Sequence, residues 1–136
     1  MSTKVLFLCP HGAAKSVMAK AYFNQFARQQ GLTVAADAAG TEPDAVVAPI
    51  VVEMLNREGL DVSQHQPRHV TAEDLKSAQR IISMGCSPEE LGVSTERIEQ
   101  WNDIPPVSQN PDSARTIIRD HVEQLVTELQ RHVQSS

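Results

Sequence analysis

The stretch KVLFLCPHGAAKS, residues 4–16, decides the fold. The run from Val5 to Cys9 is apolar on both faces, as expected of a strand buried inside a parallel sheet. A turn of small residues follows. From Ser16 onward, apolar residues recur at helical spacing until Gly31 stops the helix, and Ser16 or the turn before it can cap the helix start. The stretch therefore predicts a strand, a tight turn and a helix in unbroken order.

The turn is also a candidate site for an anion. Cys9 lies at the end of the strand, where backbone N–H groups and the positive end of the helix can converge. This geometry binds tetrahedral oxyanions and, with the cation of Lys15, stabilises a thiolate. The alternative is a cysteine that only packs at the strand end, because cysteine is among the most buried residue types. The small-residue turn and Lys15 favour a reactive Cys9.

Length and composition are those of one globular domain. The chain has 136 residues and no internal repeat, which predicts a single domain over residues 1–136. A formal charge of −5 without a basic stripe speaks against nucleic acid or a membrane surface as a partner. The five apolar residues between Lys4 and Pro10 are too few for a signal peptide or a membrane span. We therefore expect a cytoplasmic protein.

Strands and helices alternate along the rest of the chain. We expect, in order, a strand at 32–39, helices at 49–57 and from 71, strands at 80–84 and 97–101, and a last helix capped by Asp112 or Ser113. Such alternation predicts an α/β fold with a parallel sheet covered on both sides. Ligands of these sheets bind beyond the carboxyl ends of the strands. Cys9 and Cys86 both follow strands, so they could share one crevice.

Landmarks spread over nearly the whole chain resemble a known family. Cys9, five further residues, Lys15 and Ser16 at the end of a first strand look like the phosphate-binding loop of the low-molecular-weight protein tyrosine phosphatases and of the arsenate reductases of the same fold. The other landmarks are Ala39-Gly40-Thr41, LNREGLDVS at 55–63, TAEDL at 71–75, the strand at 80–84, and the tail from Trp101 through 118–120. This resemblance implies a three-layer α/β sandwich around a four-stranded parallel sheet in the order 2-1-3-4.

The resemblance also implies a chemistry. The Cys9 thiolate would attack the central atom of a bound oxyanion, and the Ser16 hydroxyl would stabilise that thiolate. In the phosphatases this gives a phosphocysteine, and an Asp of an Asp-Pro pair protonates the leaving group. In the arsenate reductases it gives a cysteine–arsenate adduct, which a second thiol resolves with release of arsenite. Backbone N–H groups would hold the oxyanion, and the residues concerned are Pro10, His11, Gly12, Ala13, Ala14 and Lys15.

Two places in the loop depart from the family. Lys15 stands where the family has Arg, and an ammonium cannot make the bidentate contact of a guanidinium. Losing one such donor at a transition state costs about 3 kcal/mol, or roughly a hundredfold in rate. His11 and Gly12 stand where the family usually has Gly and Asn. His11 could donate to the oxyanion, stabilise the thiolate as a cation, or simply face solvent.

The general acid of the phosphatases is missing from its usual place. Counted from Trp101, the Asp-Pro pair of the family falls on Pro105-Pro106. Asp103 lies two residues away and could substitute, although an Asp in a loop near Pro often serves only the turn. Without an acid, hydrolysis of an unactivated phosphoester should be slow.

Cys86 is a candidate second thiol. A resolving cysteine follows the third strand in the arsenate reductases, and Cys86 lies in that loop, one position later than the alignment places it. The alternative is a buried loop thiol that only packs. His65 and His69 lack nearby acids or cysteines for a metal site, and a metal on Cys9, His11 and Cys86 would block the anion loop. We therefore expect no resident metal or cofactor.

Three interpretations follow. The first is thiol-dependent arsenate reduction, in which Cys9 attacks and either Cys86 or an external thiol such as thioredoxin, glutathione or mycothiol resolves. The second is a cysteine-dependent phosphatase acting on phosphotyrosine or a small phosphoester, which Lys15 and the missing acid weaken. The third is an anion-binding or regulatory module that has lost catalysis. The expected ligand is a small oxyanion or phosphoester, and the first interpretation adds a thiol redox partner.

Overall fold

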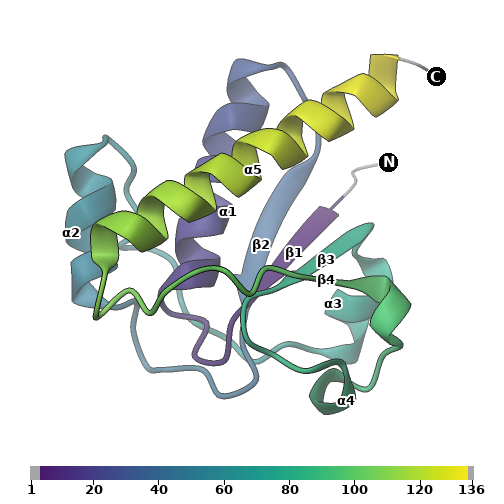
Figure 1. Cartoon of the computed structure of the whole chain (residues 1–136), viewed down its shortest axis with the longest axis horizontal. Helices are drawn as coiled ribbons and strands as arrows, with labels where there is room; N and C mark the ends of the chain where they lie inside the picture. The colour runs from purple at the N-terminus through teal and green to yellow at the C-terminus, as the bar shows by residue number, and fades with distance from the viewer. Residues whose placement is uncertain (1–3, 135–136) are drawn as a thin grey trace.

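A twisted four-stranded sheet forms the centre of the molecule (Figure 1). The computed structural model describes residues 4–134. All neighbouring strands are parallel, and their order is β2-β1-β3-β4. The α/β fold and the strand order predicted from the sequence are therefore confirmed. The strands are β1 (Lys4–Leu8), β2 (Ala35–Ala39), β3 (Arg80–Ser83) and β4 (Ile98–Gln100).

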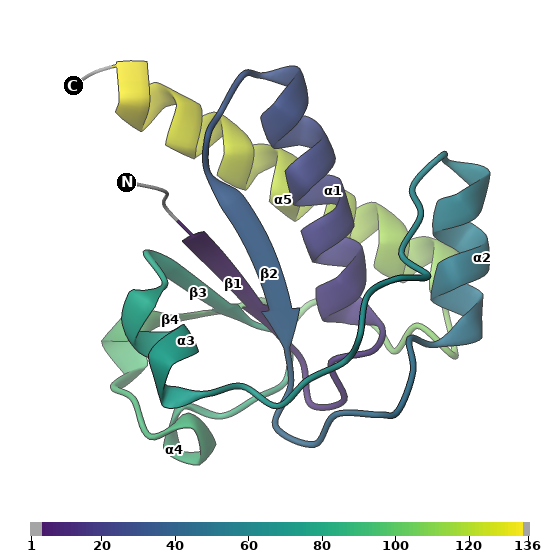
Figure 2. The same cartoon turned by 180° about the vertical axis from the view of Figure 1, so that it is seen from behind.

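Helices cover both faces of the sheet, as Figures 1 and 2 show. The helices on one face are α1 (Lys15–Gln29), α2 (Pro49–Arg57) and α5 (Pro111–Gln134). Those on the other face are α3 (Ala72–Ser77) and α4 (Pro88–Leu91). A short 3₁₀ turn, Thr95–Arg97, precedes β4. Among the described residues, no helix is both long enough and apolar enough to cross a membrane.

β1 is buried because it lies between β2 and β3 and its side chains pack into two hydrophobic cores, one on each face of the sheet. Successive side chains of a strand point to opposite faces. Val5, Phe7 and Cys9 therefore pack into the larger core, with α1 and α5, whereas Leu6 and Leu8 pack into the smaller core, with α3 and α4. The run that is apolar on both faces thus reflects a strand covered on both sides.

The predicted elements are present, but two of them begin elsewhere. The second strand begins at Ala35 rather than at Leu32, because the Leu32 N–H donates to the Ala27 carbonyl and belongs to the end of α1. The last helix begins at Pro111 rather than after a cap at Asp112 or Ser113. Both of those residues lie inside its first turn, so the predicted caps are wrong.

One helix was not predicted. α4 is a single turn directly after Cys86, where the expectation was a loop. The Ser87 hydroxyl accepts from the Glu90 N–H, and Pro88 occupies the first helical position. A helix of four residues is too short to show a hydrophobic period, so the spacing of apolar residues does not predict it.

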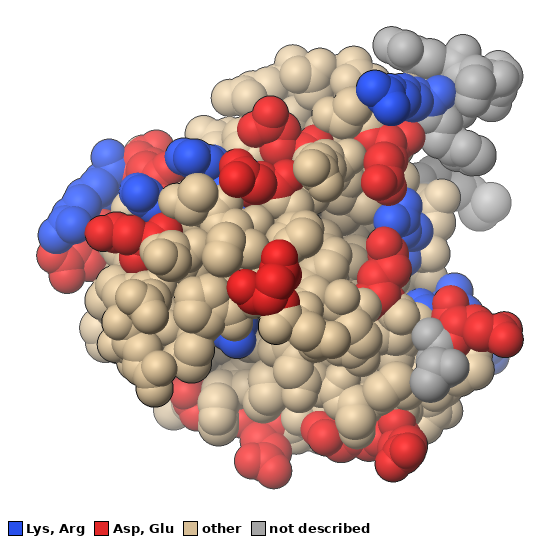
Figure 3. All heavy atoms as spheres, viewed as in Figure 1, with Lys and Arg blue, Asp and Glu red and all other residues tan. Residues whose placement is uncertain are grey.

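On the face that Figure 3 shows, charged side chains are spread out rather than gathered in one patch. On the face in Figure 3, Lys and Arg side chains lie next to Asp and Glu side chains. The charges therefore do not form a continuous basic surface on this face.

Candidate active site

The Cys9 loop, residues 9–15, joins the carboxyl end of β1 to α1. Cys9 is 4% exposed and lines a pocket of about 420 Å³. Its Sγ lies 3.2 Å from the Oγ of Ser16, which is fully buried in the first turn of α1. A serine hydroxyl in this place can donate to the sulfur once the thiol has lost its proton. The structure thus brings Cys9 and Ser16 together, and their catalytic roles stay predictions.

Several carbonyl groups of the Cys9 loop are bonded to the crossover between β2 and α2. Three of them accept hydrogen bonds of 2.7–3.0 Å from the next crossover segment, in the pairs Glu42 N–Pro10 O, Asp44 N–His11 O and Ala48 N–Ala13 O. Within the described residues, the N–H groups of His11, Ala13, Ala14 and Lys15 donate to no protein acceptor. Neighbouring backbone N–H groups without a protein acceptor can bind an anion, so these four donors are available to a bound oxyanion.

Two members of the predicted anion-binding set do not contribute an N–H in this way. Pro10 carries no backbone N–H, so it drops out of the set of donors. The Gly12 N–H already donates to the Cys9 carbonyl at 3.2 Å, which closes the loop.

The start of α1 is not capped by Ser16 as the sequence suggested. Its N-cap residue is Ala14 without any side-chain cap, because Ser16 bonds Cys9 instead, so the positive end of the helix stays open to the pocket.

Gly40, just after β2, packs closely against the backbone of the Cys9 loop. A Cβ atom at this position would lie 2.6 Å from the Pro10 oxygen, 2.7 Å from the Cys9 oxygen and 2.7 Å from the Gly12 nitrogen. Gly12 itself has φ +59°, a left-handed conformation that glycine adopts readily. Both glycines are therefore needed for the backbones to approach this closely.

Lys15 lines the pocket and reaches across it. Its Nζ donates to the carbonyl of Ile104 at 3.3 Å. Ile104 belongs to the wall segment, residues 102–110, which connects β4 to α5 and supplies Pro106, Val107 and Ser108 to the opposite side of the pocket. The Lys15 ammonium thus lies between the Cys9 loop and the wall segment.

Asp103, the candidate substitute acid, is turned away from the pocket. Both of its carboxylate oxygens lie 2.9–3.0 Å from the Nε2 of His121 on α5. The His121 ring stacks on Trp101 at a centroid distance of 4.7 Å. The hydrogen bond from His121 holds the pKa of Asp103 below its ordinary value. A carboxylate kept ionised and absent from the pocket lining is not placed to protonate a leaving group at Cys9.

Cys86 lies at the same end of the sheet as Cys9 but packs on the other face. Cys86 is 1% exposed and belongs to the smaller core, whereas Cys9 belongs to the larger one. Its Sγ lies 3.9 Å from the Thr41 Oγ1, and burial raises the pKa of the Cys86 thiol. The Ser83 hydroxyl bonds both the N–H and the carbonyl of Cys86. Cys86 does not line the pocket, so the expected common crevice is not formed in this conformation.

Asp44, which was not among the residues predicted from the sequence, also lines the pocket. Its Oδ1 is 3.3 Å from the Nδ1 of His11, and both residues line the pocket. Asp44 comes from the crossover between β2 and α2 and is brought there by its own N–H, which donates to the His11 carbonyl. No sequence motif marks this contact. The pocket also has an apolar side, formed by Ile50, Met84 and Val107.

The two histidines considered for a metal site have other partners. His65 Nδ1 lies 3.1 Å from the Lys20 ammonium, and His69 Nδ1 lies 2.6 Å from the Val70 carbonyl oxygen. Among the described residues, no three His, Cys, Asp or Glu side chains lie close enough together to hold a metal ion.

Comparison with known proteins gives the family. The model of a family described as low molecular weight phosphotyrosine protein phosphatase matches residues 4–100. The chain belongs to this family. It is 33% identical over 130 residues to a Halobacterium salinarum protein described as "Putative arsenate reductase", a match that covers 94% of the chain and 91% of the relative.

Solved structures agree with this assignment. YfkJ from Bacillus subtilis superposes with a TM-score of 0.85 at 26% identity, over 97% of both chains. An arsenate reductase from Archaeoglobus fulgidus superposes with a TM-score of 0.71 at 26% identity, over 90% of this chain and 98% of that one. The chain is therefore an enzyme of a superfamily that contains both arsenate reductases and phosphatases.

Proposed function

We propose that this enzyme reduces arsenate, with Cys9 as the nucleophile and a thiol as the reductant. The observation that carries the proposal is the Cys9–Ser16 contact of 3.2 Å, in a loop with four N–H groups that donate to no protein acceptor and that leads into the uncapped N-terminus of α1. Such a loop binds a tetrahedral oxyanion and stabilises a thiolate. The relative from Halobacterium salinarum, at 33% identity, supports arsenate as that oxyanion.

The reaction then has two stages. In the first, the Cys9 thiolate attacks arsenic, an S–As bond forms, and one oxygen leaves as water after it has gained a proton, while arsenic stays in the +5 state. In the second, a thiolate attacks the Cys9 sulfur, and the electron pair of the S–As bond passes to arsenic, which leaves as arsenite. A further thiol reduces the resulting disulfide. Overall, two thiols give one disulfide, arsenite and water.

The wall segment favours arsenate over an ordinary phosphoester. An alkoxide or phenoxide leaving group needs a positioned acid, and this wall offers Pro106, Val107 and Ser108 instead. The oxygen that leaves arsenate departs as water, a small group that a donor elsewhere in the pocket can protonate, whereas the acid of the phosphatases is positioned for a larger alcohol or phenol. A wall without a carboxyl group therefore fits arsenate better than an ordinary phosphoester.

The second thiol is proposed to be external. Cys86 is buried in the smaller core, and its pKa is raised by that burial and further by the charge of Cys9, so the thiolate that a direct attack on Cys9 needs is disfavoured. Thioredoxin, glutathione and mycothiol are the candidate reductants.

The test is arsenite production by wild type, Cys9→Ser and Cys86→Ser with each of the three thiol systems. We expect Cys9→Ser to abolish turnover, because no thiolate remains to attack arsenic. Cys86→Ser is the matched control, since it makes the same change in a thiol outside the pocket, and it should retain most of the activity. A wild-type enzyme that forms no arsenite with any of the three systems would exclude the proposal.

The apolar side of the pocket favours a second candidate, hydrolysis of a phosphomonoester. Ile50, Met84 and Val107 leave room beside Cys9 for an organic group that arsenate does not have. Turnover of an activated aryl phosphate by wild type, lost in Cys9→Ser, would support this candidate. Binding of arsenate or phosphate without any turnover would instead point to a module that binds anions only.

A further inference from the structure

We infer that His11, oriented by Asp44, is the proton donor to the oxygen that leaves the bound oxyanion. The inference rests on the proposed function, because attack by Cys9 expels an oxygen that must be protonated. The usual acid is replaced by proline at Pro105-Pro106, and Asp103 is bonded to His121 outside the pocket. A proton donor therefore has to come from another part of the pocket.

The residues that line the pocket offer few candidates for the proton donor. Apart from Cys9 itself, the titratable side chains that line it are His11, Lys15 and Asp44. The Lys15 ammonium already donates to the Ile104 carbonyl, and it serves best as a fixed positive charge. Asp44 faces a histidine ring. Imidazole is the side chain that most readily gives and regains a proton near neutral pH, so His11 is the donor the lining provides.

Two contacts hold His11 to Asp44. The Asp44 Oδ1 lies 3.3 Å from the His11 Nδ1, and the Asp44 N–H donates to the His11 carbonyl at 3.0 Å. A carboxylate beside Nδ1 favours a proton on that nitrogen and leaves Nε2 as the nitrogen that can transfer a proton, as in catalytic triads. In the described part of the chain, this ion pair is the one polar side-chain contact that the structure shows for the His11 ring.

Stability does not explain the pair. The side chains of His11 and Asp44 are 62% and 56% exposed, and ion pairs this open to water contribute little to folding. The same openness lets the ring recover its proton from solvent after each turnover. The pair therefore fits a function at the pocket mouth better than a structural role.

The proton balance is simple. As the bond from the Cys9 sulfur to arsenic forms, the leaving As–OH oxygen takes the Nε2 proton and departs as water. The neutral imidazole then takes a proton from solvent. No oxidation or reduction occurs in this stage.

The test compares His11→Gln and Asp44→Asn with His121→Gln, a matched control in the His–Asp pair outside the pocket. We expect His11→Gln to lower arsenate reduction by about a hundredfold, Asp44→Asn by about tenfold, and the control by less than about twofold. Alkylation of Cys9 by iodoacetamide expels iodide, which needs no proton. Its rate should change by less than about threefold in all three variants, provided each melts cooperatively like wild type.

Other outcomes would overturn the inference. If alkylation falls in parallel with reduction in His11→Gln, the ring acts on the thiol and not on the leaving oxygen. If His121→Gln loses as much activity as His11→Gln, the acid is Asp103.

Failure of the proposed function is recognised separately, because wild type would then form no arsenite. His11→Gln is in that case compared on two aryl phosphates. It must slow phenyl phosphate by at least about tenfold more than nitrophenyl phosphate, whose leaving group needs less protonation. Equal slowing, or no turnover of either ester, would overturn the inference as well.

Discussion

Gly40 is the residue on which the shape of the Cys9 loop depends most directly. Three backbone atoms lie 2.6–2.7 Å from the place of its missing Cβ, so a methyl group cannot fit unless the loop moves. We expect Gly40→Ala to lower the free energy of unfolding by about 1–3 kcal/mol, as overpacking does, and to weaken oxyanion binding. Urea denaturation and calorimetric titration with arsenate measure the two effects.

Gly31→Ala is the matched control for this prediction. Gly31 ends α1 with φ +70°, and nothing lies within 4 Å of its missing Cβ. Its replacement should cost only about 1 kcal/mol of backbone strain and leave arsenate binding unchanged. Equal losses of arsenate affinity in the two variants would contradict the role given to Gly40.

At the level of residues, the sequence predicts the Cys9–Ser16 contact better than the other contacts around the pocket. Cys9 and Ser16 are close in the chain, and a strand, turn and helix in succession bring them together. Asp44 contacts His11, and His121 contacts Asp103, but the partners of each pair are far apart in the sequence. Only the fold brings them together. Spacing along the sequence cannot show such contacts, which is why the partner of His11 was missed and Asp103 was considered as an acid at the pocket.

Among the elements, the wall segment, residues 102–110, is the one that Lys15 fixes in place. Its two prolines, Pro105 and Pro106, have no N–H to donate, so few backbone hydrogen bonds hold it. The Lys15 ammonium supplies one contact through the Ile104 carbonyl. We expect Lys15→Met to speed amide hydrogen exchange at Val107, and to weaken arsenate binding by about tenfold or more through the loss of a charged donor.

Lys76→Met on α3 is the control, since it removes the same charge far from the pocket. It should leave both the exchange rate at Val107 and the affinity for arsenate unchanged. If Lys15→Met also leaves the exchange rate unchanged, the buried side chains of Ile104 and Val107 alone hold the segment.

Capping chemistry explains which element boundaries could be read from the sequence. Thr71 caps α3 in a full capping box with Asp74, a local pattern that the sequence shows directly. The starts of β2 and α5 follow instead from backbone hydrogen bonds, from the Leu32 N–H to the Ala27 carbonyl and from the Ala114 N–H to the Asn110 carbonyl. A side-chain cap therefore marks the start of α3 in the sequence, whereas bonds between backbone groups alone leave no such mark at the other two boundaries.

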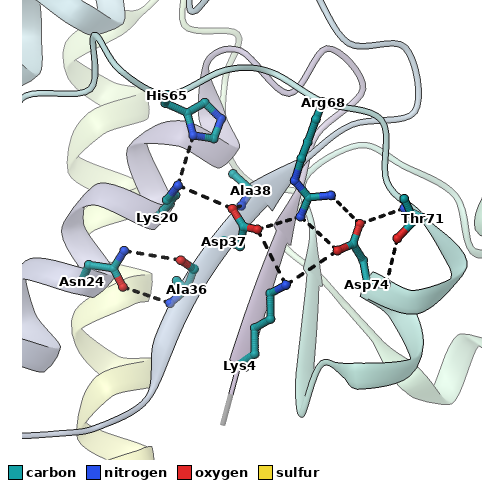
Figure 4. A network of polar contacts seen from close by, with 10 residues as sticks. All are labelled: Lys4, Lys20, Asn24, Ala36, Asp37, Ala38, His65, Arg68, Thr71 and Asp74. Atoms are coloured by element: carbon teal, nitrogen blue, oxygen red, sulfur yellow. Dashed lines mark hydrogen bonds and ion pairs between the residues drawn. The ribbon is translucent and has the colours of Figure 1, made fainter. Parts of the chain in front are cut away.

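At the scale of the whole molecule, a network of charges joins the sheet to the segment before α3 (Figure 4). The Arg68 guanidinium bridges Asp37 on β2 and Asp74 on α3, with contacts of 2.6–3.0 Å. Lys4 on β1 lies within 3.7 Å of both carboxylates, and Lys20 on α1 adds a contact to Asp37. Five separate parts of the chain thus meet in this network.

The network should make the fold sensitive to acid. Burial by itself would raise the pKa of Asp37 and Asp74, but hydrogen bonds from Arg68 and from backbone N–H groups outweigh it, so the pKa of each carboxyl lies below its ordinary value. The unfolded chain then takes up protons at a higher pH than the folded one. This contribution to stability is complete above the unfolded pKa of about 4 and is lost as the pH falls through the lower folded values.

We therefore expect the free energy of unfolding to fall steadily between about pH 5 and pH 2 in wild type, and to fall less steeply in Asp74→Asn. The variant should also be less stable at pH 7, since it leaves Arg68 with one carboxylate fewer. Urea denaturation at half-unit steps of pH measures both effects. Asp112→Asn, at a carboxylate that is 92% exposed, is the matched control and should keep the wild-type slope. Parallel curves for wild type and Asp74→Asn would show that the acid sensitivity has another origin than the charges around Arg68.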